Sequence, residues 1–204
     1  MDKSYWEQYY ETHQLPASPS TFSVFVSDYL KSGHTLVELG CGNGRDSLHF
    51  GENLKVIAVD QCENEVKFLN SKFSSENLTF FAGDFTNLKK FDSSIEYIYS
   101  RFTFHSVDEE SETRTLQWVY DSLNDNGLFF VELRSIKDEL CGSGQKVAEN
   151  AYVTDHYRRF SNKNELEKKI KEVGFEIIYI IEDKGLAIYK DEDPVVIRVV
   201  AKKT

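Results

Sequence analysis

The chain has 204 residues, of which 40% are hydrophobic and 14% aromatic, enough to bury a core without disulfide bonds or metals. Its formal net charge is −10 at pH 7. Because phosphate binding needs a basic face, this charge argues against nucleic acid and against an anionic membrane surface as partners. A small molecule is still a possible ligand. Because the net charge is a sum over the whole chain, a local basic pocket is compatible with it.

The cysteines and the N-terminal segment indicate a cellular compartment. Cys41, Cys62 and Cys141 are an odd set with neither zinc nor CxxC spacing, which predicts free thiols in a reducing compartment. The polar start of the chain is not a signal peptide, and no apolar run approaches the roughly 18 residues of a membrane span. We therefore expect a cytoplasmic protein. No cluster of His, Asp and Glu has a metal-ligand spacing, so no metal is expected.

Helices and strands are expected to alternate along most of the chain. Two helices come first, over residues 4–12 and 19–31. Five strand-like segments follow, "TLVELG", "KVIAVD", "LTFFAGD", "IEYIYSR" and "GLFFVELRS", with helices at 62–72 and 108–123 among them. After a capped helix in "SNKNELEKKIKEVGF", two strands with no helix between them predict an antiparallel hairpin. The pattern predicts one α/β domain over residues 1–204.

A glycine-rich loop follows the first predicted strand. In "VELGCGNGRD" the glycines Gly40, Gly42 and Gly44 are spaced G-x-G-x-G. Dinucleotide-binding enzymes use G-x-G-x-x-G, and Arg45 stands where their third glycine would be, so a dehydrogenase is disfavoured. The loop still lets the backbone approach a flat or extended ligand that lies across the strand ends.

The next two strands each end in an aspartate. Asp60 could accept hydrogen bonds from both hydroxyls of a ribose, and Asp84 from an exocyclic amine while Phe85 lies against a purine. Aspartate is also common after strands as a turn former. Suitable groups at three consecutive strand ends nevertheless favour a site for a nucleoside-containing cofactor.

These segments, together with "YIYSRFTFHS" and the terminal hairpin, resemble the class I S-adenosylmethionine-dependent methyltransferases over nearly the whole chain. The resemblance implies a Rossmann-like seven-stranded mixed sheet with helices on both faces and the last strand antiparallel. It implies S-adenosyl-L-methionine as cofactor, with Glu38, Gly40 and Gly42 at its methionine part, Asp60 at the ribose, and Asp84 and Phe85 at the adenine. The complete set of expected cofactor contacts is Trp6, Tyr10, Glu38, Gly40, Gly42, Gly44, Asp46, Asp60, Gln61, Asp84, Phe85 and Ser100.

The combination of "GNGRD" with an aromatic N-terminal helix is most similar to small-molecule members of the thiopurine and tellurite-resistance type. In that type an N-terminal segment covers the cofactor, which would make residues 1–32 a helical lid that carries Tyr5, Trp6, Tyr9 and Tyr10. Aromatic faces attract a cation such as a methyl sulfonium. The alternative is an ordinary amphipathic helix docked onto the core.

The segment after the fourth strand, "SRFTFHSVDEE", is expected to face the methyl group. It lacks the Asn- or Asp-Pro-Pro-aromatic motif of methyltransferases that act on nucleobases and amides. His105 titrates near neutral pH, so it is a candidate general base, although a packing role is equally open. Arg101 is expected to point towards the acceptor or the carboxylate of the cofactor.

A local basic cluster lies in an insertion, residues 136–160, on the acceptor side. His156, Arg158 and Arg159, with Arg134 at the end of the preceding strand, suggest an anionic acceptor, because a guanidinium matches phosphate or carboxylate. Tyr157 joins His105 and Arg101 as a candidate catalytic group. The alternative is that these arginines pair with surface acids. The "CGSGQK" stretch predicts a mobile loop.

The segments "SRFTFHS" and "HYRRF" are also loosely similar to methyltransferases linked to bacterial surface polysaccharides. This similarity implies O-methylation of a sugar, a nucleotide-activated sugar or a phosphoryl-type group such as a phosphoramidate, in capsule biosynthesis. Two alternatives remain open: transfer to a thiol or a metalloid oxyanion, and a non-catalytic protein that binds the cofactor and regulates a partner. A homodimer is compatible with the sequence, which does not identify the acceptor.

Overall fold

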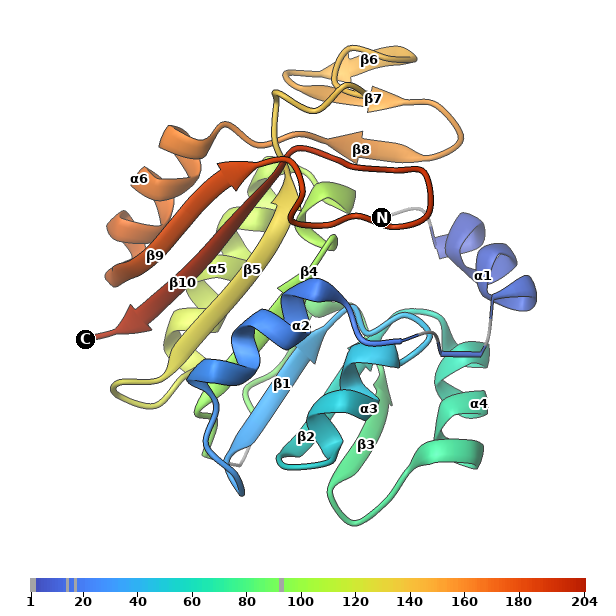
Figure 1. Ribbon diagram of the computed structural model, residues 1–204, viewed down its shortest axis with the longest axis vertical. Coiled ribbons are helices and arrows are strands. Elements are labelled where there is room, and N and C mark those ends of the chain that lie inside the picture. The colour runs from blue at the N-terminus through green and yellow to red at the C-terminus, as the bar shows by residue number, and fades with distance from the viewer. Residues whose placement is uncertain (1–2, 14, 17, 92–93) are drawn as a thin grey trace.

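The computed structural model describes residues 3–13, 15–16, 18–91 and 94–204. Its main sheet has seven strands in the order β3-β2-β1-β4-β5-β10-β9 (Figure 1). β10 runs antiparallel to β5 and β9, while the other neighbouring pairs are parallel. The predicted Rossmann-like seven-stranded sheet with an antiparallel last strand is therefore confirmed. The strands are β1 (Thr35–Leu39), β2 (Lys55–Asp60), β3 (Leu78–Ala82), β4 (Tyr97–Arg101), β5 (Leu128–Arg134), β9 (Phe175–Asp183) and β10 (Val196–Lys203).

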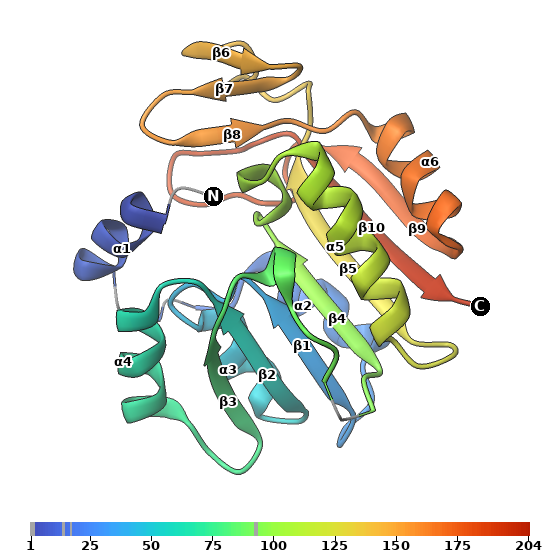
Figure 2. The same ribbon diagram turned by 180° about the vertical axis from the view of Figure 1, so that it is seen from behind.

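Helices cover both faces of this sheet. One face packs against α2, α3 and α4, and the other against α5 and α6, which Figure 2 shows in front of the sheet. The helices are α2 (Thr21–Val26), α3 (Arg45–Gly51), α4 (Glu63–Phe73), α5 (Glu109–Ser122) and α6 (Lys163–Val173), with short 3-10 turns η1 (Ser27–Tyr29), η2 (Phe85–Asn87) and η3 (Phe104–Ser106). The two apolar cores between helices and sheet hold the strand ends in place, and those ends carry the site.

The ends of the helices follow the capping signals in the sequence. The side chain of Asp108 accepts a hydrogen bond from Ser111 N at the start of α5, and Asn162 caps α6 in the same way. Gly174 ends α6 with a φ of 115°. The helix expected over 19–31 is shorter, because α2 ends at Val26 and continues only as η1.

The insertion forms a small antiparallel sheet that the sequence did not predict. Its strands are β6 (Gln145–Ala148), β7 (Ala151–Val153) and β8 (Tyr157–Arg159). Both views show it above the ends of β4 and β5, separate from the main sheet. Since β6 takes up the last residues of "CGSGQK", the predicted loop is shorter than expected.

The N-terminal helix α1 (Lys3–Thr12) stands apart from the main core, and none of its described residues is buried. It lies between α4 and the insertion. Lys3 Nζ lies 3.1 Å from an oxygen of Glu63 on α4, and Tyr5 donates a 2.9 Å hydrogen bond to Asp155 between β7 and β8. The predicted lid, 1–32, includes residues 1, 2, 14 and 17, which lie outside the described residues. In the described part of the chain no helix is both long and apolar enough to cross a membrane.

Candidate functional site

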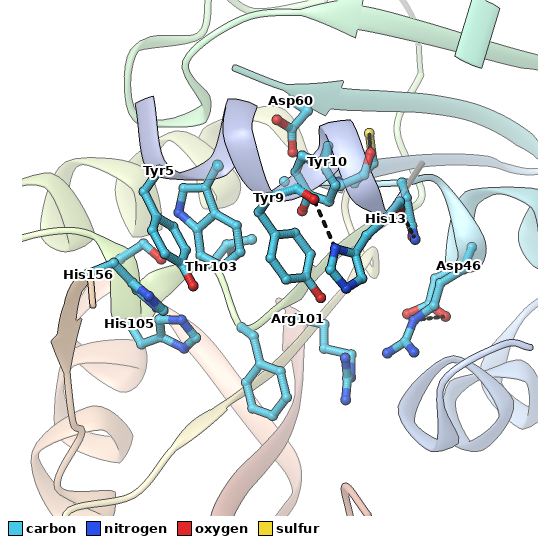
Figure 3. Close-up of a pocket in the computed structure, with 18 of the residues that line it drawn as sticks. Tyr5, Tyr9, Tyr10, His13, Asp46, Asp60, Arg101, Thr103, His105 and His156 are labelled. Carbon is cyan, nitrogen blue, oxygen red and sulfur yellow. Dashed lines mark hydrogen bonds and ion pairs between the residues drawn. The ribbon is translucent and has the colours of Figure 1, made fainter. Parts of the chain in front are cut away.

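A pocket of about 830 Å³ lies at the carboxyl ends of β1, β2, β4 and β5. Its other walls come from α1, from the insertion and from residues 184–195, the loop between β9 and β10 (Figure 3). This is the edge of an open parallel sheet at which α/β proteins bind ligands. The predicted site residues that line the pocket are Trp6, Tyr10, Glu38, Gly40, Gly42, Asp46, Asp60, Gln61, Phe85, Arg101, Arg134, His105, His156 and Arg158.

The glycine loop presents its backbone to the pocket. Gly40 and Gly42 both adopt positive φ, at 75° and 54°. A Cβ atom on Gly40 would lie 2.2 Å from the Cγ2 atom of Thr103, and one on Gly42 would lie 2.4 Å from the hydroxyl of Tyr10. Gly40 therefore requires glycine for space as well as for conformation, whereas at Gly42 the space is limited by the end of the Tyr10 side chain. The space beside Gly40 and Gly42 is so narrow that a side chain at either position would fill it.

Asp60, at the end of β2, holds this loop. One carboxylate oxygen accepts a 2.9 Å hydrogen bond from Gly42 N, and the other accepts one of 2.9 Å from Cys62 N. Each carboxylate oxygen has a second lone pair that can accept from another donor. Asp60 therefore fits a ligand that carries vicinal hydroxyls, such as a ribose, while it keeps the loop in shape.

Asp46 and Glu38, two further carboxyl groups of the pocket, have pKa values that are shifted in opposite directions. Asp46 accepts hydrogen bonds from Ser20 and Tyr99. Burial alone would raise the pKa of Asp46, but the Arg45 charge and the Ser20 hydrogen bonds outweigh burial and lower it. Burial and the nearby Asp46 charge raise the pKa of Glu38 well above its usual value. A cation beside Glu38 would favour its ionised form, so this end of the pocket fits an ammonium or sulfonium group.

Aromatic rings of α1 line the pocket from the glycine loop to the insertion. Tyr10 lies over Gly42, and the ring centroids of Tyr5 and Trp6 lie 4.2 Å and 5.1 Å from that of His156. The amide of Asn43, in the glycine loop, donates to the carbonyl of His13, 3.1 Å away, just after α1. The helix is thus tied both to the glycine loop and to the insertion, an arrangement that fits a cover over the pocket.

Arg101 reaches the pocket from the end of β4. Its Nε atom donates to the buried carboxylate of Glu132, 2.9 Å away, and Arg198 donates to the other oxygen of Glu132. Phe102, with a positive φ of 54°, lies below the Arg101 guanidinium at 4.3 Å from ring centroid to Cζ. Because Glu132 engages only Nε, the terminal amino groups of Arg101 are directed into the pocket, as Figure 3 shows.

The other pocket arginines are each paired with acids. Arg134 lies within 3.2 Å of both carboxylate oxygens of Asp138, and its second amino group lies 2.9 Å from Glu192. Arg158 lies 2.7 Å from Asp155. Arg134 and Arg158 therefore pair with acidic side chains, which is the alternative given in the sequence analysis. Since a guanidinium has five N–H donors, these partners leave donors available to a ligand.

His105, in η3, is 6% exposed and lines the pocket between these arginines. Within the described part of the chain, its Nδ1 atom has no hydrogen-bond partner. Burial, and then the charges of Arg134 and the neighbouring basic groups, lower the pKa of His105 well below its usual value. The imidazole is therefore neutral at neutral pH, with a nitrogen that no described side chain uses.

Three predicted cofactor residues do not line the pocket. Asp84 accepts hydrogen bonds from the backbone and the hydroxyl of Thr86, which caps η2. Ser100 is fully buried and its hydroxyl contacts that of Thr103. Gly44 packs against side chains of α4 and β3. These three residues lie beside the pocket and contact neighbouring protein groups instead of lining it.

Two predicted acceptor-side residues also lie outside the pocket lining. Tyr157 is half-buried in β8. Arg159 donates to the carbonyl oxygen of Val107, 3.0 Å away, and pairs with Glu112 on α5. Because side chains alternate along a strand, Arg158 and Arg159 point in opposite directions, and only Arg158 faces the pocket.

Several pocket residues were not predicted as site residues. Phe102 and Thr103 lie between Arg101 and His105, the two residues of this segment that the sequence predicted. Tyr189 and Glu192 come from the loop between β9 and β10, which carries no motif. Among the described residues, no group of three or more His, Cys, Asp and Glu could hold a metal ion.

Asp60→Ala is expected to weaken S-adenosylmethionine binding by about 1–3 kcal/mol, the scale for hydrogen bonds to a charged group. The loss would have two sources, the predicted hydrogen bonds to the ribose and the hydrogen bond that Asp60 accepts from Gly42 N. Isothermal titration calorimetry measures it, with Asp60→Asn as the control that keeps the shape and removes the charge. Titration with NAD should give no heat, and tight NAD binding would contradict the cofactor assignment.

Comparison with known proteins agrees with this geometry. Residues 36–127 match the family described as a methyltransferase domain. Similar solved structures include an S-adenosylmethionine-dependent methyltransferase from Methanosarcina mazei, with TM-score 0.75 and 16% identity over 93% of this chain and 99% of that chain. A putative S-adenosylmethionine-dependent methyltransferase from Listeria monocytogenes has TM-score 0.73 and 15% identity over 90% of this chain and 97% of that chain. No curated protein matches the sequence.

The glycopeptide N-methyltransferase MtfA, solved in complex with S-adenosylhomocysteine, is a third similar structure, with TM-score 0.70 and 15% identity over 92% of this chain and 88% of that chain. At this identity the structural comparisons establish the fold. The narrow glycine loop and the carboxyl groups of Asp60 and Glu38 that line the pocket fit S-adenosylmethionine. Residues 36–127 thus match a methyltransferase domain, and the chain as a whole has the fold of S-adenosylmethionine-dependent methyltransferases.

Proposed function

We propose that the protein O-methylates a small anionic acceptor. The observation that carries the proposal is the division of charge within one pocket. Glu38, Asp46 and Asp60 lie around the glycine loop, where a cationic cofactor fits. Arg101, Arg134 and Arg158 lie on the other side together with the acidic partners Asp155 and Glu192, and these arginines keep N–H donors available to a ligand. Such a division favours a cofactor and an acceptor of opposite charge, each held at its own end.

His105 is the proposed general base. S-adenosylmethionine supplies an electrophilic methyl group when it is bound, and a hydroxyl acceptor must then lose its proton. A neutral imidazole that lines the pocket can take that proton. The arginines around it stabilise an anionic acceptor and also keep His105 neutral. A thiol ionises more readily and would not need this base.

The proposed acceptor is a sugar, a nucleotide-activated sugar or a phosphoryl-type group such as a phosphoramidate. Planar guanidiniums can offer two parallel donors to the oxygens of a phosphoryl or carboxylate group. The loose similarity of "SRFTFHS" and "HYRRF" to methyltransferases of bacterial surface polysaccharides supports a role in capsule biosynthesis. The aromatic helix α1, tied to the glycine loop, supports the similarity to the thiopurine and tellurite-resistance type, with α1 as the lid.

Arg158→Lys is expected to raise the acceptor KM by roughly tenfold, the scale of one hydrogen bond to a charged group. A lysine offers a point charge in place of the fork. Arg159→Lys is the matched control in the next position, because its side chain faces Glu112 instead of the pocket. The control should leave the acceptor KM unchanged and lower the thermal stability. Equal acceptor kinetics in the Arg158→Lys variant and the wild type would contradict the role of Arg158.

A panel of acceptors tests the proposed function. S-adenosylhomocysteine release is measured with phosphorylated sugars and nucleotide sugars, and in parallel with the same sugars without phosphate and with simple thiols. The proposal expects turnover with at least one charged sugar and little with its uncharged counterpart. Turnover with thiols alone would favour a soft nucleophile. Cofactor binding with no turnover on any acceptor would favour the non-catalytic alternative.

A further inference from the structure

We propose that Glu192 is a specificity-determining residue, a carboxylate that occupies Arg134 until an anionic acceptor replaces it. Glu192 lies in the loop between β9 and β10 and lines the pocket beside the acceptor-side arginines. Its carboxylate lies 2.9 Å from an amino group of Arg134. The inference rests on the proposed function, because only an anionic acceptor would compete for this guanidinium.

The two partners of this ion pair are held very differently. The Arg134 side chain is 12% exposed and is fixed by Asp138, whose carboxylate is 2% exposed and accepts from the other amino group. The Glu192 side chain is 68% exposed. Glu192 can therefore regain water when it leaves, while Arg134 stays in place with Asp138 still bound. This asymmetry makes Glu192 the partner that a ligand can displace at small cost.

The tip and the base of the loop are held by different contacts. Glu192 and Tyr189 exchange two backbone hydrogen bonds of 3.0 Å, which close a tight turn at the tip. The base is anchored separately, since the carbonyl of Leu186 accepts from Thr21 and Arg198. Figure 1 and Figure 2 both show the loop reaching from the β9–β10 pair towards α1, beside the insertion.

The displacement would select among acceptors. An uncharged sugar cannot replace the Glu192 carboxylate on Arg134. In its presence the ion pair between Glu192 and Arg134 remains, and Glu192 continues to occupy part of the pocket. A phosphoryl group carries more charge and three acceptor oxygens, and it can take over the same amino group in a charge-assisted hydrogen bond. Rejection of the wrong ligand by an element that must be displaced is a common source of specificity.

Anion binding to the protein saturated with S-adenosylhomocysteine tests the proposal, with inorganic phosphate as the probe at constant ionic strength. The apparent Kd for phosphate is obtained from the rise in Tm. Glu192→Gln should lower that Kd roughly two- to fivefold, the scale of an exposed ion pair. Asp191→Asn removes the same charge one residue away, where the side chain does not line the pocket, and should match the wild type. Arg134→Lys should raise the Kd in both the wild-type and the Glu192→Gln backgrounds.

The outcomes separate this inference from the proposed function. If phosphate binds and depends on Arg134 but Glu192→Gln binds it no more tightly than the wild type, the Glu192 inference is overturned and the anionic acceptor stands. If phosphate stabilises neither the wild type nor Glu192→Gln, both are overturned. Binding that does not change in Arg134→Lys would show an adventitious ion only and would also overturn the inference.

Discussion

Replacing His105 with alanine is expected to lower kcat by roughly 10²- to 10⁴-fold, the contribution of a general base. The binding of S-adenosylmethionine should be unchanged, because His105 lies among the acceptor-side arginines and not beside the glycine loop. Steady-state kinetics and calorimetry on the same variant measure both quantities. His105→Asn is the control, since an amide keeps a polar group at this place but cannot take a proton. It should be as slow as the alanine variant.

The pH dependence follows from the same environment. Burial and the neighbouring positive charges lower the pKa of His105, so the imidazole is already neutral well below pH 6.5. The protonated fraction, which cannot act as a base, therefore becomes significant only in acid. We expect kcat/KM to stay level from neutral pH down past the usual histidine pKa and to fall only below it. A fall centred near the usual pKa of histidine, or full activity of His105→Ala, would contradict the base assignment.

Gly40→Ala is expected to weaken S-adenosylmethionine binding by roughly 10- to 100-fold, since overpacking and a strained positive φ each cost about 1–3 kcal/mol. The added Cβ would lie 2.2 Å from Cγ2 of Thr103, a buried side chain whose hydroxyl is hydrogen-bonded to that of Ser100. The loop must then shift from the geometry that Asp60 and the strand ends impose. Calorimetry with S-adenosylmethionine measures the loss, and circular dichroism confirms that the variant is folded.

Gly42→Ala is the matched comparison within the same loop. Its Cβ would lie 2.4 Å from the hydroxyl and 3.1 Å from the Cζ atom of Tyr10, at the far end of a side chain that reaches the loop from α1. We expect a smaller loss of affinity, and the double variant Gly42→Ala with Tyr10→Phe should recover part of it. Equal losses at the two glycines, with no recovery in the double variant, would show that Tyr10 does not set the space over Gly42.

Much of the fold was predictable because its signals are local. The alternation of apolar strands and amphipathic helices, the capping residues Asp108 and Asn162, and the glycine loop each act within a few residues. The same holds for Asp60, which follows directly from the end of a buried strand. The sheet of the insertion was missed because its strands are short and β6 is exposed throughout, so no apolar alternation marks it.

The direction of individual side chains could not be predicted, because tertiary contacts decide it. Arg158 and Arg159 are adjacent and chemically identical, yet one faces the pocket and the other is bound to Glu112 on α5. Asp84 stands at a strand end as Asp60 does, but it caps η2. The pairing of Arg134 with Glu192 joins residues 58 positions apart, and no local pattern reports such a contact.

The most direct test of the central claim follows the methyl group itself. The protein is incubated with S-adenosylmethionine labelled with ¹³C at the methyl position and with the phosphorylated sugars and nucleotide sugars of the panel, and the products are examined by NMR. The account predicts a new labelled methyl signal bonded to oxygen of a charged acceptor, which is lost in His105→Ala. Label on sulfur, or label that appears equally on an acceptor without a charged group, would contradict it.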